Sequence, residues 1–173
     1  MKPKLIPGAG RARESGFTLV ELTAVISILG VLAAAALPRM TALTGDARYA
    51  SLNSARAALS TVATMSHAKF LINGQTTQTL QDSTVSLVHG YPAAIPATAG
   101  AAGLGADYVV YTQASGPSAT TPAVYAGSMS LVPRDIAGTA KAVDCFLIYE
   151  EASVANPVPR IRPGGNTTAR TCA

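Results

Sequence analysis

The chain has 173 residues, of which 49% are hydrophobic and 5% aromatic, and it contains no tryptophan. This length predicts one modest domain with an appendage, whose core is built largely from small side chains. The formal net charge is +4. Because residues 1–16 hold most of it, the remainder is close to neutral and charge does not favour a general nucleic-acid-binding protein.

Residues 17–37 form an apolar segment with one charged residue, Glu21, and a short basic stretch precedes them. As a helix this segment spans about 31 Å, which is enough to cross a bilayer core. The positive-inside rule then places the N-terminus in the cytoplasm and the bulk of the chain outside. The segment fits a signal peptide cut after the apolar run, a plain membrane anchor, or a precursor cut between Gly16 and Phe17.

The phrase GFTLVE followed by an apolar helix resembles the start of type IV pilins and pseudopilins. The resemblance implies that residues 1–16 are a leader, which a prepilin peptidase removes after Gly16, and that the new N-terminal Phe17 is N-methylated. Glu21 matches the acidic residue that meets the Phe17 amine of a neighbouring subunit. A carboxylate in hydrocarbon costs about 2.5–3.5 kcal/mol on insertion scales. We therefore interpret the pair as a device for register between subunits; the alternative is a glutamate that snorkels to the interface.

The apolar helix, residues 17–38, is expected to cross the membrane and later to form the filament core. Gly30 and Pro38 match the helix-breaking residues of type IV pilins, so the helix is expected to break or bend near Pro38 and to be soft between these two residues. Residues 39–73 continue as an amphipathic helix, with a second bend considered at Gly45. Its apolar face follows steps of three and four residues: Leu52, Ala55, Leu59, Val62, Ser66 and Phe70.

Residues 74–173 are richer in Thr, Ser, Gly and Pro, and they predict a head of short strands. Candidate strands lie within 83–92, where the strand ends in a turn at 90–92, and at 108–113, 123–133 and 142–151, with a short helix near 99–104. Residues 156–165 hold several prolines and fit an edge strand or a loop. A long helix packed on a small antiparallel sheet is an α+β, pilin-like fold.

The two cysteines, Cys145 and Cys172, lie near the C-terminus. An even count downstream of a membrane signal favours a disulfide, which closes a loop over 145–172; the alternative is two buried thiols. Arg160, Arg162 and Arg170 make this loop basic. They fit either a surface contact with DNA or another polyanion or a solvated loop that meets a neighbouring subunit.

No arrangement in the sequence favours catalysis, a cofactor or a metal site. The histidines His67 and His89 are isolated, and no catalytic triad order stands out. Type II secretion pseudopilins, which this chain resembles at its N-terminus, bind calcium in their C-terminal region. The late acidic residues form no compact run of oxygen ligands; they are Asp135, Asp144, Glu150 and Glu151.

The phrases ALPRMTALTGDARYASLNSARAAL, HGYPAA and DCFLIYEEA are similar to mannose-sensitive haemagglutinin pilins, a branch of the type IVa group. The resemblance implies a homo-oligomeric surface fibre for attachment and biofilm formation. Its partners would be the prepilin peptidase, an inner-membrane assembly platform and an assembly ATPase. The precursor is expected in the bacterial inner membrane and the mature chain in an extracellular pilus. The alternatives are a type II secretion pseudopilin and a minor or DNA-uptake pilin, of which nucleic-acid binding is the less favoured.

Overall fold

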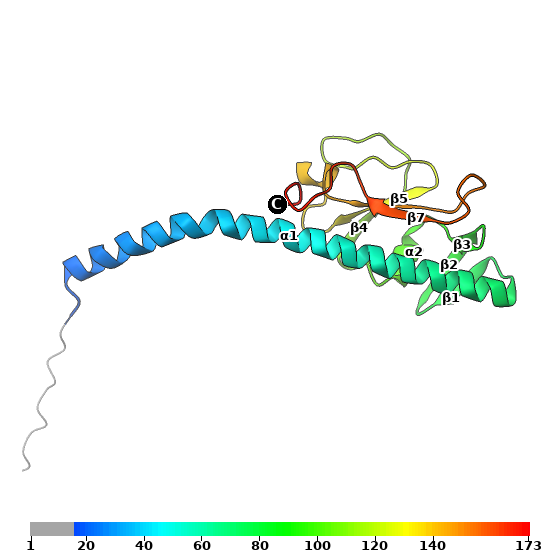
Figure 1. Cartoon of the computed structure of the whole chain (residues 1–173), viewed down its shortest axis with the longest axis horizontal. Coiled ribbons are helices and arrows are strands. Elements are labelled where there is room, and N and C mark those ends of the chain that lie inside the picture. The colour runs from blue at the N-terminus through cyan, green and yellow to red at the C-terminus, as the bar shows by residue number, and fades with distance from the viewer. Residues whose placement is uncertain (1–15) are drawn as a thin grey trace, which may run out of the picture. The chain divides into compact units, whose positions relative to one another are not determined.

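The computed structural model describes residues 16–173, so the predicted basic leader lies outside the described residues except for Gly16. The first element is helix α1 (Leu19–Asn73) (Figure 1). It ends before Gly74, whose φ of 65° is the left-handed conformation typical of a glycine that stops a helix. The chain divides between Arg39 and Met40 into two compact units, and α1 contributes residues to both.

Helix α1 is continuous through Gly30, Pro38 and Gly45. The break in secondary structure expected near Pro38 is therefore absent from this single chain. A proline removes one backbone donor from a helix, and this helix, with 55 residues, keeps bonded turns on either side of it. Softening of the stretch between Gly30 and Pro38 inside a filament stays a prediction.

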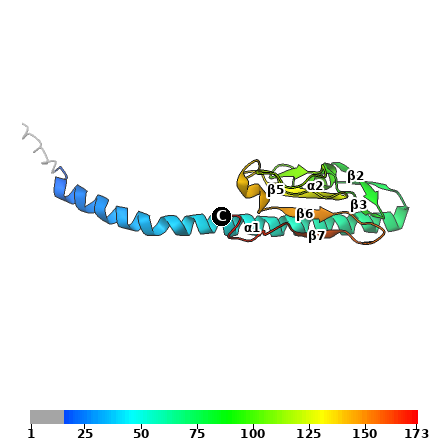
Figure 2. The same cartoon turned by 90° about the horizontal axis from the view of Figure 1, so that it is seen from above.

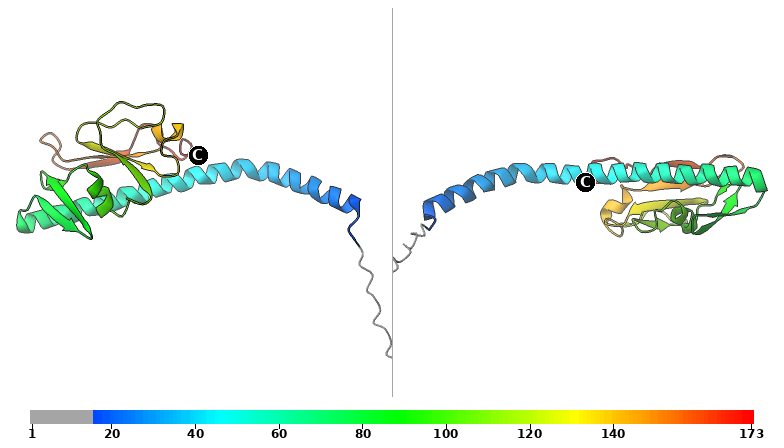
Figure 3. Two further views of the ribbon diagram at one scale, coloured as in Figure 1. Left: turned by 180° about the vertical axis from the view of Figure 1, so that it is seen from behind. Right: turned by 90° about the horizontal axis from the view of Figure 1, so that it is seen from below.

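The second half of α1 buries the face that the sequence pattern predicts. Leu52, Ala55, Leu59, Val62 and Ser66 are buried, while Phe70 is half-buried. Leu52, Ala55 and Leu59 belong to one core cluster with side chains of two central strands, including Met129, Leu131, Leu147 and Tyr149. The sheet that holds these strands lies along this half of α1 (Figures 2 and 3).

The head contains two antiparallel sheets. One has the order β1-β2-β3, with β1 (Thr77–Leu80), β2 (Ser83–Val88) and β3 (Tyr91–Pro92). After helix α2 (Pro96–Ala101), the other has the order β4-β5-β6-β7. Its strands are β4 (Tyr108–Tyr111), β5 (Ser128–Pro133), β6 (Leu147–Glu150) and β7 (Arg160–Pro163), with the short helix η1 (Ala140–Val143) between β5 and β6. This arrangement confirms the predicted α+β, pilin-like fold.

Strand β5 is buried along its whole length. Side chains of α1 pack against β5 in the core. The segment that precedes β5 in the chain also covers this strand. The Ser130 hydroxyl donates to the Ala123 carbonyl oxygen at 2.9 Å, and Val124 is buried. The polar residues of β5 are thus satisfied by a loop, which lets a strand with two serines lie at the centre of the fold.

Several predicted boundaries are wrong for local reasons. The strand expected over 142–151 begins at Leu147, because Ala140–Val143 forms a 3-10 turn in which the Asp144 amide donates to the Lys141 carbonyl oxygen at 3.2 Å. Helix α2 begins at Pro96, earlier than expected, with proline at its first position, where the missing N–H costs nothing.

Strand β1 is not predicted from the sequence, because its residues TQTL are largely polar. The edge position expected for residues 156–165 is confirmed by β7.

Candidate assembly segment and disulfide-anchored head

The N-terminal part of α1 is long and apolar enough to cross a membrane. It covers Leu19–Leu37, with a mean hydropathy of 2.2 and none of its residues buried. Two hydroxyls within it bond to the helix backbone: Thr23 to the Val20 carbonyl oxygen at 3.0 Å and Ser27 to the Thr23 carbonyl oxygen at 2.7 Å. Because these polar groups are satisfied internally, they do not oppose burial in lipid or protein.

Glu21 is held by Thr18 at the start of this helix. Its carboxylate accepts hydrogen bonds from the Thr18 backbone N–H at 2.9 Å and from the Thr18 hydroxyl at 2.8 Å. The Glu21 amide donates back to the Thr18 hydroxyl at 3.3 Å. This reciprocal pattern is a capping box, which satisfies backbone donors that the first helical turn leaves open. The sequence analysis missed it, although the T-x-x-E spacing before an apolar run was its signal.

The predicted cleavage bond between Gly16 and Phe17 lies outside the helix. Residues 16–18 have no regular secondary structure, the Phe17 side chain is 94% exposed, and a Cβ added to Gly16 would meet nothing within 4 Å. In this single chain Phe17 is joined to Gly16, so its amine is not free to pair with Glu21. The contact between the Phe17 amine of one subunit and Glu21 of another stays a prediction.

In the head, Cys145 and Cys172 form a disulfide, with their Cα atoms 5.1 Å apart and both residues fully buried. Arg48 on α1 joins this region to the helix. Its Nη1 donates to the Cys172 carbonyl oxygen at 2.6 Å, and its Nε lies 2.7 Å from the Asp135 carboxylate. The guanidinium therefore bonds at the same time to the C-terminal segment and to Asp135 in the turn that follows β5.

Gly45 allows this C-terminal segment to lie directly against α1. A Cβ at Gly45 would overlap the Ala169 carbonyl oxygen and would lie 2.8 Å from Cβ of Ala173. The helix is continuous through Gly45, and close packing of the C-terminal segment is a reason for a glycine at this position. Lys141 adds a hydrogen bond to the Ala173 carbonyl oxygen.

The three arginines predicted for surface contact are exposed, but they do not act alike. Arg160 and Arg162 alternate with Ile161 and Pro163, so they share the exposed face of β7. Arg162 lies 2.6 Å from the Glu150 carboxylate on the neighbouring strand, which offsets its charge. Arg170 lies in the C-terminal segment beyond β7.

The histidines and late acidic residues are spread among separate contacts. His67 stacks on Tyr91, with ring centroids 4.1 Å apart, and its Nδ1 lies 3.1 Å from the Gly90 carbonyl oxygen. The Glu151 carboxylate accepts from the Ala94 amide at 2.8 Å. Within residues 16–173, no group of three or more His, Cys, Asp or Glu side chains is placed to hold a metal ion.

Comparison with known proteins points to the N-terminal segment. Residues 11–37 match the prokaryotic N-terminal methylation motif. A stretch of 47 residues is 47% identical to the type IV narrow pilus major component PilA5 of Thermus thermophilus. This match covers 27% of the present chain and 40% of that relative, so less than half of the relative's length is spanned. No solved structure matches the chain.

The two matches concern type IV pilus components in general. They do not address the likeness to mannose-sensitive haemagglutinin pilins, which stays a prediction, and they do not favour the pseudopilin alternative. The motif and the apolar helix fit a membrane-anchored precursor that becomes part of a surface pilus. The N-terminal part of this chain thus carries the prokaryotic N-terminal methylation motif, and a stretch of the chain is similar to a type IV pilus component.

Proposed function

We propose that the mature chain is a structural subunit of a type IV pilus. The observation that carries this proposal is the apolar span Leu19–Leu37, which follows Gly16 and Phe17, contains Glu21 and has no buried residue in the single chain. A helix of this kind needs an apolar surrounding at every stage. The bilayer provides it before assembly, and the helices of other subunits provide it in a fibre.

Processing would occur between Gly16 and Phe17. The exposed, non-helical backbone of residues 16–18 supports access by a prepilin peptidase, and the match over residues 11–37 supports N-methylation of Phe17. The peptidase, an inner-membrane assembly platform and an assembly ATPase are the proposed partners. The precursor would span the inner membrane once with its N-terminus in the cytoplasm, since the basic residues 2, 4, 11 and 13 precede the span.

Register in the fibre would depend on Phe17 and Glu21. Transfer of an apolar helix from lipid to a bundle exchanges one apolar surrounding for another, so packing and polar contacts decide the geometry. The hydrogen bonds from Thr18 hold the Glu21 carboxylate beside the start of the mature chain. A cationic amine from a neighbouring subunit would find this carboxylate already placed, and leaving either charge unpaired in a low dielectric is costly.

Purified fibres test the proposal directly. We expect their main subunit to begin at Phe17 and to carry one added methyl group, as measured by mass spectrometry and N-terminal sequencing. A Gly16→Val precursor should keep its leader and yield no fibres. A mature chain that begins elsewhere, or a surface without fibres that contain this chain, would overturn the proposal.

Attachment and biofilm formation are the proposed roles of the fibre. A role in DNA uptake is the second candidate, because Arg160 and Arg170 are exposed on the head. DNA binding by purified fibres that weakens steeply with salt and is reduced by Arg160→Ala would favour it. Binding without salt dependence would exclude it. A pseudopilin role would instead require that deletion of the gene blocks protein export and leaves attachment intact.

A further inference from the structure

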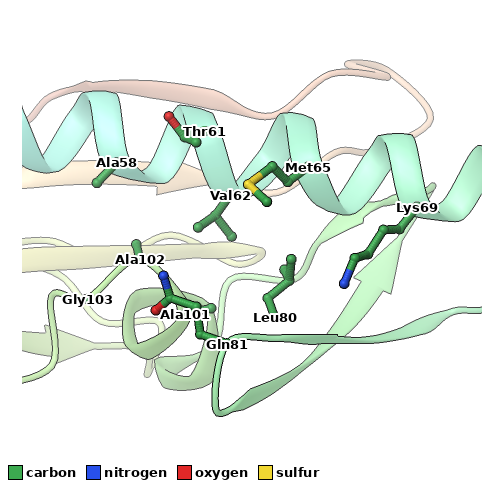
Figure 4. Close-up of a pocket in the computed structure, with 10 residues that line it drawn as sticks. All are labelled: Ala58, Thr61, Val62, Met65, Lys69, Leu80, Gln81, Ala101, Ala102 and Gly103. Carbon is green, nitrogen blue, oxygen red and sulfur yellow. The ribbon is translucent and has the colours of Figure 1, made fainter.

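A groove opens on the head beside α1. It has a volume of about 340 Å³ and is lined mostly by apolar residues, among them Val62, Met65, Lys69, Leu80, Ala101 and Ala102. Figure 4 shows α1 side chains on one side of it and residues of the β1–β2 turn and the end of α2 on the other. We call it the α1 groove.

The floor of the α1 groove is part of the second core cluster. Val62, Leu80 and Ala101 belong to that cluster and are almost fully buried, whereas Met65 above them is 51% exposed. An apolar core that reaches the surface under a half-exposed methionine gains free energy if a further apolar group covers it. The small side chains of Ala101 and Ala102 leave the room.

A second feature of the head is an exposed apolar turn. The loop between β6 and β7 carries Val154, which is 90% exposed, and Val158, which is 56% exposed. Val154 lies in a turn closed by two hydrogen bonds: from the Ser153 amide to the Asn156 carbonyl oxygen at 2.7 Å, and from the Asn156 amide to the Ser153 hydroxyl at 3.1 Å. This turn, residues 153–156, presents its valine in a preorganised backbone, so docking it costs little conformational entropy.

Charge also matches between the two features. Lys69 is the one charged residue that lines the α1 groove, and its Nζ donates to the Thr79 carbonyl oxygen at 2.8 Å, which keeps the cation at the rim. Glu151 is the one charged residue in the loop 151–159. A cationic rim and an anionic loop favour their encounter and disfavour pairing of two loops or two grooves.

We infer that the Val154 turn of one copy docks in the α1 groove of a second copy. Val154 is exposed in its own chain, so the turn does not fill the groove of the molecule that carries it. A contact between two different surfaces of the same chain is heterologous and, where the rotation does not close, generates a helical filament. The inference rests on the proposed function, and it names the head contact that accompanies burial of the apolar helix.

Cysteine pairing in assembled fibres tests the contact. We expect fibres of the Met65→Cys/Val154→Cys variant to give covalent dimers and longer multimers after treatment with a short bismaleimide. The matched control is Thr64→Cys/Val154→Cys, because Thr64 is exposed on the next position of α1 but does not line the groove; it should stay monomeric. Intact fibres without multimers, or equal multimers from both variants, would overturn the inference.

A charge substitution keeps the inference testable if the paired cysteines impair folding. Val154→Asp should leave the melting temperature of the head unchanged, because the side chain is exposed, but should cause a loss of fibre. Ala119→Asp, which places the same charge on another exposed loop, should retain fibre yield. Normal fibres from Val154→Asp would overturn the inference. The cysteine at residue 65 also reports on other occupants of the groove. If this thiol is inaccessible to the reagent in fibres but forms no cross-link to residue 154, lipid or another protein covers the groove, and the inference is overturned. Absence of fibres from the unmodified chain would contradict the proposed function itself.

Discussion

The carboxylate of Glu21 closes the first turn of its own helix by accepting two hydrogen bonds from Thr18, at 2.9 and 2.8 Å. The same carboxylate is proposed to meet the amine of a neighbouring Phe17. One side chain therefore has two separable roles, a local one that needs an acceptor and an intermolecular one that needs a negative charge. Substitutions can distinguish them.

Glu21→Gln keeps an oxygen that can accept from Thr18 and removes the charge. We expect Glu21→Gln and Glu21→Ala to be processed to Phe17 but to assemble poorly, because the neighbouring amine loses its counter-charge. Thr18→Val removes the hydroxyl cap at a cost of about 0.5–2 kcal/mol of helix stability and should still form fibres. The measurement is fibre yield at equal amounts of mature subunit. Normal assembly of Glu21→Gln together with failure of Thr18→Val would assign Glu21 to helix capping alone.

The Cys145–Cys172 disulfide should be a main source of stability in the head. Both cysteines are fully buried in the core cluster, and Arg48 bonds to the Cys172 carbonyl oxygen. We expect Cys145→Ala/Cys172→Ala to lower the free energy of unfolding by about 2–5 kcal/mol, measured by denaturant titration of the purified chain in detergent. A reducing agent should destabilise the unmodified chain and leave the double variant unchanged. Equal stability of the two proteins would contradict this role.

Gly45 and Gly30 lie in the same helix but have different surroundings. A Cβ at Gly45 would meet Ala169 and Ala173, whereas one at Gly30 would meet nothing within 4 Å. We expect Gly45→Ala to lower stability by about 1–3 kcal/mol through overpacking, because the C-terminal segment must move away from α1. Gly30→Ala adds only helix propensity, so its thermal unfolding should be unchanged or raised. Equal effects of the two substitutions would mean that the C-terminal segment is not held against Gly45.

Local sequence pattern was sufficient to predict many features of this molecule. The motif around Gly16, Phe17 and Glu21 lies in one short stretch, and the buried face of α1 follows from spacing alone, so both could be predicted. Gly45 resembled a helix bend because its reason lies more than a hundred residues away, at Ala169 and Ala173. The α1 groove joins three segments that only the tertiary fold brings together, and no sequence pattern marks it.

The buried Tyr149 predicts a loss of stability at alkaline pH. Burial raises the pKa of its hydroxyl, and the nearby Glu151 charge adds to the effect. The hydroxyl donates to the Pro92 carbonyl oxygen at 2.6 Å. Because the pKa in the folded chain exceeds that of an unfolded tyrosine, about 10, the stabilisation is complete below about pH 10 and is lost as the pH rises further. Burial raises the pKa of Tyr108 as well and acts in the same direction.

Tyr149→Phe should therefore lower stability at neutral pH by about 0.5–1.5 kcal/mol, through the lost hydrogen bond, and make the alkaline decline shallower. Denaturant midpoints measured on both sides of pH 10 give the slope. Tyr125→Phe is the matched control, because Tyr125 is 58% exposed and its hydroxyl should leave the slope unchanged. An identical alkaline slope in Tyr149→Phe and the unmodified chain would show that other groups control the decline.

Substitution of Ser66, unlike that of Tyr149, is expected to raise the stability of the head. Among the described residues, its hydroxyl is the one buried side-chain group without a hydrogen-bond partner, and it lies on the apolar face of α1. Removing an unsatisfied buried hydroxyl recovers a desolvation cost of about 1–3 kcal/mol, so Ser66→Ala should stabilise the head more than Ser60→Ala does. Ser60 is exposed on the same helix, so the pair shares the gain in helix propensity and differs in burial. If Ser66→Ala destabilises the head while Ser60→Ala does not, the Ser66 hydroxyl is satisfied by a buried water, and that water is part of the packing between α1 and the first sheet.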